Sequence, residues 1–296
     1  MLNNPKQIYY ASLLAALSGV LYGFLGYFGT LVLQDNISVS TMLFWRFAIA
    51  GIWIFSFSIK KHAFKQMFRI DKLHLIMIFI LGAIGYAGSS VFYFLASQYT
   101  GTGLAMVVFF SYPIAVGFMS WVADKNIFNI SIVLMLITML IGMFLLQDFS
   151  SKAFNMIGVL FGILAGICYA IYIIGSKRFS TIAVNSNIVT LMVCFSCTFV
   201  FLTLSVLTHT ISFPHSLKTW LYVLALGVFA TALPIQLLFK SLKHISAMRA
   251  SIISVLEPLV TVLVGIVALN ESVSLLQTLG AFMILSSVIL ILKTAV

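Results

Sequence analysis

The chain has 296 residues, of which 62% are hydrophobic and only 7% are charged, whereas a soluble domain carries about 25% charged residues. A water-soluble fold of this length lacks the charged groups needed to cover its outside, so the composition excludes a soluble protein and indicates that lipid covers the surface. The formal net charge of +10 does not indicate nucleic-acid binding, because the basic residues lie in short gaps between apolar runs and not in one patch.

Ten segments of the chain are long and apolar enough to cross a bilayer, since a span needs about 20 apolar residues. In chain order they are 8–33, 40–59, 73–95, 101–122, 127–147, 155–177, 186–207, 217–239, 246–268 and 274–292. The connections are short, the longest being 60–72, and leave no room for a soluble domain. We therefore predict an all-α integral membrane protein of ten transmembrane helices, whose first apolar run is too long for a signal-peptide core and is retained.

Basic residues are distributed unevenly between the two sides of the predicted helices. If the N-terminus lies inside, thirteen basic residues fall on the inner side, namely Lys6, Lys60, Lys61, Lys65, Arg69, Lys72, Lys125, Lys177, Arg178, Lys240, Lys243, Arg249 and Lys293, and two on the outer side, Lys152 and Lys218. Cytoplasmic connections carry an excess of Lys and Arg. The pattern predicts a multi-pass protein of the plasma (bacterial inner) membrane with both termini in the cytoplasm.

The two halves of the chain resemble each other at nearly constant offsets. The matching pairs are 17–23 with 164–170, Leu81-Gly82-Ala83 with Leu226-Gly227-Val228, and Tyr112-Pro113 with Glu257-Pro258, the last two at the same offset of 145 residues. We divide the chain into a first five-helix repeat, 1–150, and a second, 151–296. Because five is odd, the second copy enters the membrane upside down, which gives the inverted repeat of many transporters.

Short motifs accompany this helix pattern. An Arg lies in the apolar second helix, within Phe44-Trp45-Arg46-Phe47, and the ninth helix has Leu256-Glu257-Pro258 at its centre and Leu269-Asn270-Glu271 at its end. With the ten-helix pattern, these motifs make the chain similar to the drug/metabolite transporter superfamily, in particular its EamA-type members. The first half departs from the family pattern, with Tyr112 in place of the acid and Asp124 as an approximate counterpart of the closing Glu. The resemblance implies a carrier of small organic solutes.

Two ionisable side chains lie within the predicted spans, Glu257 near mid-depth and Arg46 about six residues from the outer end of the second helix. Glu257 is about 11 residues, or roughly 16 Å, from either end of the ninth helix, and an ionisable group at that depth is expected to face a cavity or a partner. Glu257 would bind a cationic part of the substrate or take up a proton, or else it is a protonated carboxyl group bonded to a neighbouring helix. Arg46 would pair with a substrate carboxylate or a gate residue, or extend its long stem to the membrane interface. Together the two side chains suit a zwitterion such as an amino acid.

Aromatic residues recur near the predicted mid-depth and above it. Tyr22, Tyr86, Tyr112 and Tyr169 lie near the middle, while Tyr27, Trp45 and Tyr93 lie closer to the outer side as candidates for a gate or outer vestibule. Such rings hold apolar groups and offer hydroxyls to a substrate. The alternative roles are packing and interfacial anchoring. Tyr22 and Tyr169 are the stronger candidates for substrate binding because the repeat places them equivalently.

Pro113 and Pro258 each remove a backbone donor inside a predicted span and are expected to bend it, either as hinges or as static kinks. All five histidines lie in loops or at helix ends, and the three cysteines lie in apolar runs. We therefore predict no metal site and no catalytic residues. Because no phosphate-binding Gly loop with Lys is present, we expect no cofactor and no direct use of ATP.

These features favour a secondary active transporter that exports an amino acid or a related small metabolite by alternating access, driven by protons through Glu257 or by the solute's own gradient. An uptake carrier for a nucleoside derivative, a vitamin or a quaternary amine remains open. A membrane-embedded lipid enzyme would need clustered acids or histidines, and a channel would need polar rings along its pore, so both are disfavoured. The expected partners are the substrate, protons and lipid, not nucleic acid, and the chain is expected to be a monomer or a homodimer.

Overall fold

The computed structural model describes residues 5–60, 70–124, 130–146, 155–181, 185–269 and 274–293. Within these ranges the regular structure is helical and no strand is present. The elements are α1 (Pro5–Tyr22), α2 (Leu25–Leu33), α3 (Val39–Lys60), α5 (Lys72–Ile80), η1 (Leu81–Ala87), α6 (Gly88–Phe109), α7 (Tyr112–Asp124), α8 (Ile130–Leu146), α9 (Met156–Thr181), α10 (Ser186–Leu207), α11 (Leu217–Gly227), η2 (Val228–Ala232), α12 (Leu233–Leu242), α13 (Ala247–Ser254), α14 (Leu256–Leu269) and α15 (Leu275–Lys293). The motif residues Asn270 and Glu271 and the basic residues Lys61, Lys65, Arg69, Lys125 and Lys152 lie outside the described residues.

Eight apolar helical stretches of the described chain are long enough to cross a membrane, and two shorter apolar helices, Tyr112–Ala123 and Ile130–Leu146, complete the predicted ten. We number the spans in chain order: α1 with α2 is span 1, α3 span 2, α5 with η1 and α6 up to Thr100 span 3, the rest of α6 with α7 span 4, α8 span 5, α9 span 6, α10 span 7, α11 with η2 and α12 span 8, α13 with α14 span 9, and α15 span 10. Spans 3 and 4 meet at Gly101, whose φ of 80° and ψ of 161° lie in a region that in practice only glycine adopts.

Three spans are interrupted near their middle. The helix breaks at Gly23 and Phe24 in span 1, at 110–111 in span 4 and at Val255 in span 9. Pro113 and Pro258 lie in the first turn of the helix that follows the break, where the missing N–H costs no hydrogen bond. The bends expected from the prolines are therefore found slightly before them, at equivalent places in the two repeats.

Spans 3 and 8 each contain a π-helical segment, η1 and η2, at corresponding positions of the two repeats. Glycines within η1 and directly before η2 contact the opposite repeat. A Cβ placed on Gly82 would lie 2.0 Å from the hydroxyl of Ser196 in α10, and one on Gly227 would lie 2.7 Å from a side-chain carbon of Ile49 in α3. Only glycine allows these approaches, and π segments within α-helices are frequent at functional sites.

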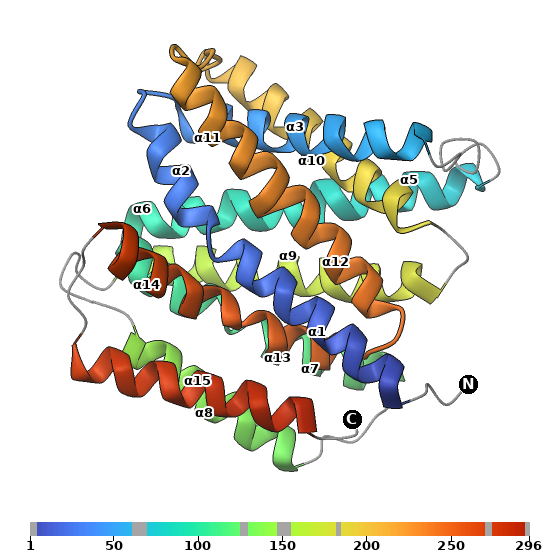
Figure 1. Ribbon diagram of the computed structural model, residues 1–296, viewed down its shortest axis with the longest axis vertical. Helices are drawn as coiled ribbons and strands as arrows, with labels where there is room; N and C mark the ends of the chain where they lie inside the picture. The colour runs from blue at the N-terminus through green and yellow to red at the C-terminus, as the bar shows by residue number, and fades with distance from the viewer. Residues whose placement is uncertain are drawn as a thin grey trace.

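The helices of the two repeats pair across the bundle (Figure 1). Helix α3 packs on α10, and α8 packs on α15. Helix α1 packs on α12 and α13, while its repeat counterpart α9 packs on α6 and α7. Helix α1 begins and α15 ends at the same end of the bundle, which we call the terminal end (Figure 1). This is the predicted architecture of ten helices in two inverted five-helix repeats.

Glycines bring span 1 and span 6 close to their partners. A Cβ on Gly23 would lie 2.4 Å from Cβ of Val260 in α14, and a Cβ on Gly162 would lie 2.7 Å from a methyl carbon of Val108 in α6. Small residues permit such close helix approach within a membrane. Because both contacts join one repeat to the other, they place the middle of spans 1 and 6 against the broken spans 9 and 4.

Candidate functional site

Arg46 lies in the core of the bundle and does not extend to the membrane interface. Its side chain comes from α3 and is 3% exposed. Its Nε donates a hydrogen bond to Oγ1 of Thr231 at 2.6 Å, and its Nη2 donates one to the hydroxyl of Tyr86 at 3.3 Å. A buried guanidinium needs such acceptors, since an unpaired charge in the core is strongly destabilising. Arg46 therefore links spans 2, 3 and 8.

The two acceptors of Arg46 occupy equivalent places in the repeats. Tyr86 lies in η1 and Thr231 lies in η2, at the offset of 145 residues that relates the matching motifs. The hydroxyl of Thr231 donates in turn to the carbonyl oxygen of Leu226 at 2.8 Å. Leu226 lies five residues before Thr231, in the helix that widens at η2. Each repeat thus uses its π segment to present one hydroxyl to the same guanidinium.

Five tyrosines from spans 1, 3, 4 and 6 form a buried cluster, which we call the tyrosine cluster: Tyr22, Tyr86, Tyr112, Tyr169 and Tyr172. The hydroxyl of Tyr86 donates to that of Tyr22 at 3.1 Å. The ring centroid of Tyr169 lies 4.7 Å from that of Tyr112 and 6.0 Å from that of Tyr86. These edge-to-face contacts are favourable aromatic geometries. The four tyrosines predicted from their depth are therefore brought together by the fold.

Tyr172 joins the cluster without having been predicted. Its ring meets that of Tyr86 edge to face at 4.9 Å. Its hydroxyl and that of Ser176, one turn along α9, are both buried and make no hydrogen bond within the described part of the chain. Its position one turn after Tyr169 is the signal that identifies it in the sequence, because residues three apart share a helix face.

Glu257 lies at the edge of the tyrosine cluster. It occupies the first turn of α14, directly after the break at Val255, and its side chain is half buried. A Cβ placed on Gly23, next to Tyr22 of the cluster, would lie 3.0 Å from the carbonyl oxygen of Glu257. Within the described part of the chain the carboxyl group makes no hydrogen bond and no ion pair. A carboxyl group in this setting is suited to bind a cationic group or a proton.

The breaks in spans 1, 4 and 9 meet beside Glu257. The hydroxyl of Tyr112 donates to the carbonyl of Ser251 at 3.2 Å, just before the break in span 9. On the other side of that break, Thr261 donates to the carbonyl of Gly23 at 3.1 Å. The interruptions free backbone carbonyls inside the membrane, and these side chains satisfy two of the carbonyls beside the breaks.

Between the tyrosine cluster and the terminal end, the interior of the bundle is densely packed. Side chains with no exposed surface fill this region, among them Ala15, Ser18, Ile173, Ile235 and Ala250. Arg249 at the start of span 9 donates from Nε to Ser12 in span 1 at 3.0 Å and from Nη2 to the carbonyl of Leu292 in span 10 at 3.0 Å. These contacts hold spans 1, 9 and 10 together at the terminal end.

The three residues predicted for a gate or outer vestibule take different positions. Tyr93 lies near Glu257, and its ring centroid is 5.5 Å from that of Phe109. Trp45 lies outside the cluster, where its indole donates to the carbonyl of Ser212 at 3.0 Å and its ring meets that of Trp220. Tyr27 contacts the ring of its neighbour Phe28 at 5.4 Å. Only Tyr93 is brought to the candidate site, and a gating role for the three stays a prediction.

Among the residues that the structure describes, no three His, Cys, Asp or Glu side chains lie close enough to hold a metal ion. The chemistry of the site is instead that of one carboxyl group, one guanidinium and several phenol hydroxyls. This set provides ionic and hydrogen-bonding groups for a small organic solute, with aromatic surface for its apolar part.

A model of the EamA-like transporter family matches both halves of the chain, over residues 9–147 and 156–293. Similar curated proteins include an uncharacterized transporter of Archaeoglobus fulgidus, 27% identical over 67% of this chain and 70% of the relative. An uncharacterized transporter of Bacillus subtilis, YcbK, is 25% identical over 63% of this chain and 62% of its own length. An uncharacterized transporter of Synechocystis sp. is 27% identical over 68% of this chain and 62% of its own length.

A solved crystal structure shares the fold, with a TM-score of 0.79 and 18% identity over 94% of this chain and 95% of the other. At that identity the likeness shows the fold alone. The family match covers both five-helix repeats, as expected from the internal similarity of the sequence. The chain is a multi-pass membrane transporter, and it belongs to the EamA-like transporter family.

Proposed function

We propose that this transporter is a secondary carrier that exports an amino acid or a related small metabolite by alternating access. The observation that carries the proposal is the tyrosine cluster where the two repeats meet, which Arg46 contacts through Tyr86 and the broken span of Glu257 contacts through Tyr112 and Gly23. Transporters built from inverted repeats bind their substrates at such an interface near the bilayer midplane, often beside broken helices.

The chemistry of the site suits a solute that carries both a positive and a negative charge. Glu257 would bind an ammonium group, because among the described residues its carboxyl group makes no hydrogen bond and no ion pair. Arg46 uses two of its five N–H groups for Thr231 and Tyr86, so further N–H groups remain for a substrate carboxylate. The rings of Tyr112 and Tyr169 would contact the apolar part of the solute. The alternative of a purely structural network predicts no effect of these residues on solute affinity.

Coupling to protons follows from the same carboxyl group. A carrier that takes up a proton at Glu257 when the solute leaves would exchange the two across the membrane. The positive-inside rule orients the terminal end toward the cytoplasm, so its packed side chains would separate the candidate site from the cytoplasm in this conformation. A pH gradient imposed on proteoliposomes then drives solute movement, and dissipating it with a protonophore abolishes that movement.

The proposal is tested by counterflow with pools of radiolabelled solutes. Proteoliposomes are loaded with an unlabelled pool of amino acids, nucleosides, vitamins or quaternary amines, and uptake of the same labelled pool is followed. We expect saturable counterflow with the amino acid pool. Label that enters in proportion to its concentration, without saturation, would indicate a channel and would contradict the carrier.

An uptake carrier for a quaternary amine is the second candidate. The observation that favours it is the group of aromatic rings near Glu257, since tyrosine faces and a carboxylate together recognise quaternary ammonium groups. Counterflow with the quaternary amine pool alone, insensitive to an excess of unlabelled amino acids, would select this candidate over amino acid export.

A further inference from the structure

A lipid-facing cavity of about 720 Å³ lies between spans 3, 4 and 6, near the terminal end. Its walls include Ile80, Ile84, Met119 and Ile171, and its end includes His74 and Arg178. The volume falls in the range of roughly 300–1,000 Å³ that is typical of small-molecule sites. The cavity lies apart from the tyrosine cluster, and transport as proposed above makes no use of it.

The long part of the cavity is apolar and opens to the surrounding membrane. Ile80 is 47% exposed, Ile84 is 59% exposed and Ile171 is 40% exposed. In a membrane these exposed side chains would contact lipid hydrocarbon. The hydrocarbon region tolerates apolar groups, because unpaired polar groups are costly there. A ligand lying along them must therefore present an alkyl chain.

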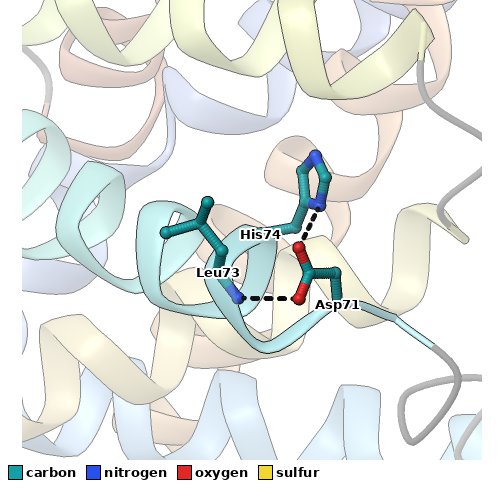
Figure 2. Close-up of polar contacts among 3 residues, drawn as sticks. All are labelled: Asp71, Leu73 and His74. Carbon is teal, nitrogen blue, oxygen red and sulfur yellow. Dashed lines mark hydrogen bonds and ion pairs between the residues drawn. The ribbon is translucent and has the colours of Figure 1, made fainter.

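The end of the cavity carries basic groups. Arg178 is exposed in the last turn of α9. His74, in the first turn of α5, faces the carboxylate of Asp71 at 3.6 Å, while the other oxygen of that carboxylate accepts from the backbone N–H of Leu73 at 3.4 Å (Figure 2). The ring of Phe179 meets the imidazole of His74 edge to face at 6.4 Å. Asp71 and Phe179 thus flank the imidazole at the end of the cavity.

We propose that this cavity binds an anionic phospholipid, with one acyl chain along Ile80 and Ile84 and the phosphate at Arg178 and His74. An anionic headgroup fits because Arg and His donate hydrogen bonds to phosphate oxygens and basic pockets between transmembrane helices bind anionic headgroups. A zwitterionic lipid would bring a cationic headgroup toward the same basic residues. The bilayer supplies this ligand at the depth where the cavity opens.

The bound acyl chain would lie where spans 3 and 6 pack closely, next to the candidate transport site. On the cavity side are Gly85 and Gly175, and a Cβ on Gly85 would lie 3.0 Å from Cβ of Tyr172 in the tyrosine cluster. A Cβ on Gly175 would lie 2.5 Å from a methyl carbon of Leu81. The lipid thus occupies the seam where spans 3 and 6 contact each other, directly behind Tyr172.

Native mass spectrometry of the purified full-length protein, titrated with dioleoyl phosphatidylglycerol or dioleoyl phosphatidylcholine, tests the site. We expect Arg178→Gln to weaken phosphatidylglycerol binding about five-fold, the loss for one basic residue near a lipid phosphate, and to leave phosphatidylcholine binding unchanged. Arg178→Lys, which keeps the charge, should restore most of the affinity. Ala123→Phe, which fills the cavity, should weaken both lipids.

Matched controls separate this site from general lipid contact. Lys293→Gln removes a basic residue of the terminal end outside the cavity, and Ala268→Phe adds a ring at an exposed position of α14. Both should bind like the wild type. The proposal is overturned if Arg178→Gln and Lys293→Gln weaken phosphatidylglycerol equally, or if Ala123→Phe changes neither lipid while its melting temperature matches the wild type.

Discussion

The hydroxyl oxygens of Tyr86 and Thr231 both accept hydrogen bonds from the guanidinium of Arg46. One hydroxyl comes from each repeat, at equivalent positions of π-helical segments that lie 145 residues apart. The two acceptors are therefore related by the inverted repeat, whereas Arg46 itself has no Arg counterpart in the second repeat. A buried cation held in this way joins the two repeats at the edge of the tyrosine cluster.

Replacing Thr231 by Val tests this link. The valine keeps the shape but removes the acceptor of Arg46 and the donor to the carbonyl of Leu226. We expect a loss of about 1–3 kcal/mol in the free energy of unfolding, because a buried charged donor is left without a partner. A double-mutant cycle with Arg46→Gln, followed by thermal unfolding in detergent, should give a coupling energy of about 1 kcal/mol or more. Additive effects of the two changes would contradict the link.

Two glycines of span 1 should respond differently to alanine. A Cβ on Gly23 would lie 2.4 Å from Cβ of Val260 in α14, whereas a Cβ on Gly26 would lie 3.6 Å from a methyl carbon of Thr261. Gly23→Ala should therefore lower the stability by about 1–3 kcal/mol through overpacking, and Gly26→Ala should have little effect. Melting temperatures of the two variants in the same detergent make the comparison, and equal values would show that the helices do not approach as described.

The turn between spans 3 and 4 depends on Gly101. Its backbone conformation is strained for any residue with a Cβ, so Gly101→Ala should cost about 1–3 kcal/mol. Gly88→Ala, also in α6, is the matched control, since its Cβ would meet only ordinary contacts, 3.7 Å from the sulfur of Cys168 and 3.9 Å from the carbonyl oxygen of Ala83. A melting temperature for Gly101→Ala as high as that of Gly88→Ala would show that the turn does not have this conformation.

The breaks before Pro113 and Pro258 should act as hinges. An alanine at either position supplies an N–H that can bond to the carbonyl four residues earlier, in Phe109 or Ser254, and extend the helix through the break. One added bond of about 1 kcal/mol would slow the conformational step roughly five-fold. We expect a lower rate of counterflow for Pro113→Ala and Pro258→Ala with unchanged solute affinity, while Pro5→Ala at the exposed start of α1 behaves as the wild type. Unchanged rates in both would exclude the hinge role.

Hydropathy was sufficient to predict the ten spans, because lipid requires long apolar helices. The matching motifs of the two halves then predicted the inverted arrangement, because each repeat contains an odd number of spans. The π segments η1 and η2 were not predicted. In a membrane helix apolar residues lie on every face, so no polar pattern marks the place where the helix widens. The breaks in spans 4 and 9 were placed two or three residues too late, since a proline in the first turn of a helix is compatible with regular geometry, and the break at Gly23 and Phe24 in span 1 was not predicted.

The candidate site was predicted in part. Depth and repeat equivalence identified Tyr22, Tyr169 and Glu257, and the fold brings them together with Tyr86 and Tyr112, while their roles in transport stay predictions. The direction of Arg46 could not be predicted from its depth, because it depends on an acceptor in span 8. That acceptor, Thr231, has a signal in the sequence, since it is the counterpart of Tyr86 at the offset of 145 residues.

The central claim is tested most directly by counterflow in proteoliposomes. Vesicles with the wild type, Glu257→Gln or Asp35→Asn are loaded with unlabelled amino acids, and uptake of the same amino acids in radiolabelled form is followed. Asp35 is the matched control, because it is a carboxylate outside the cluster that accepts from the backbone N–H of His215. We predict transient accumulation of label with the wild type and Asp35→Asn and its loss with Glu257→Gln, at equal amounts of inserted protein. Wild-type counterflow by Glu257→Gln would contradict a binding role for this carboxyl group, and with it the transport site described above.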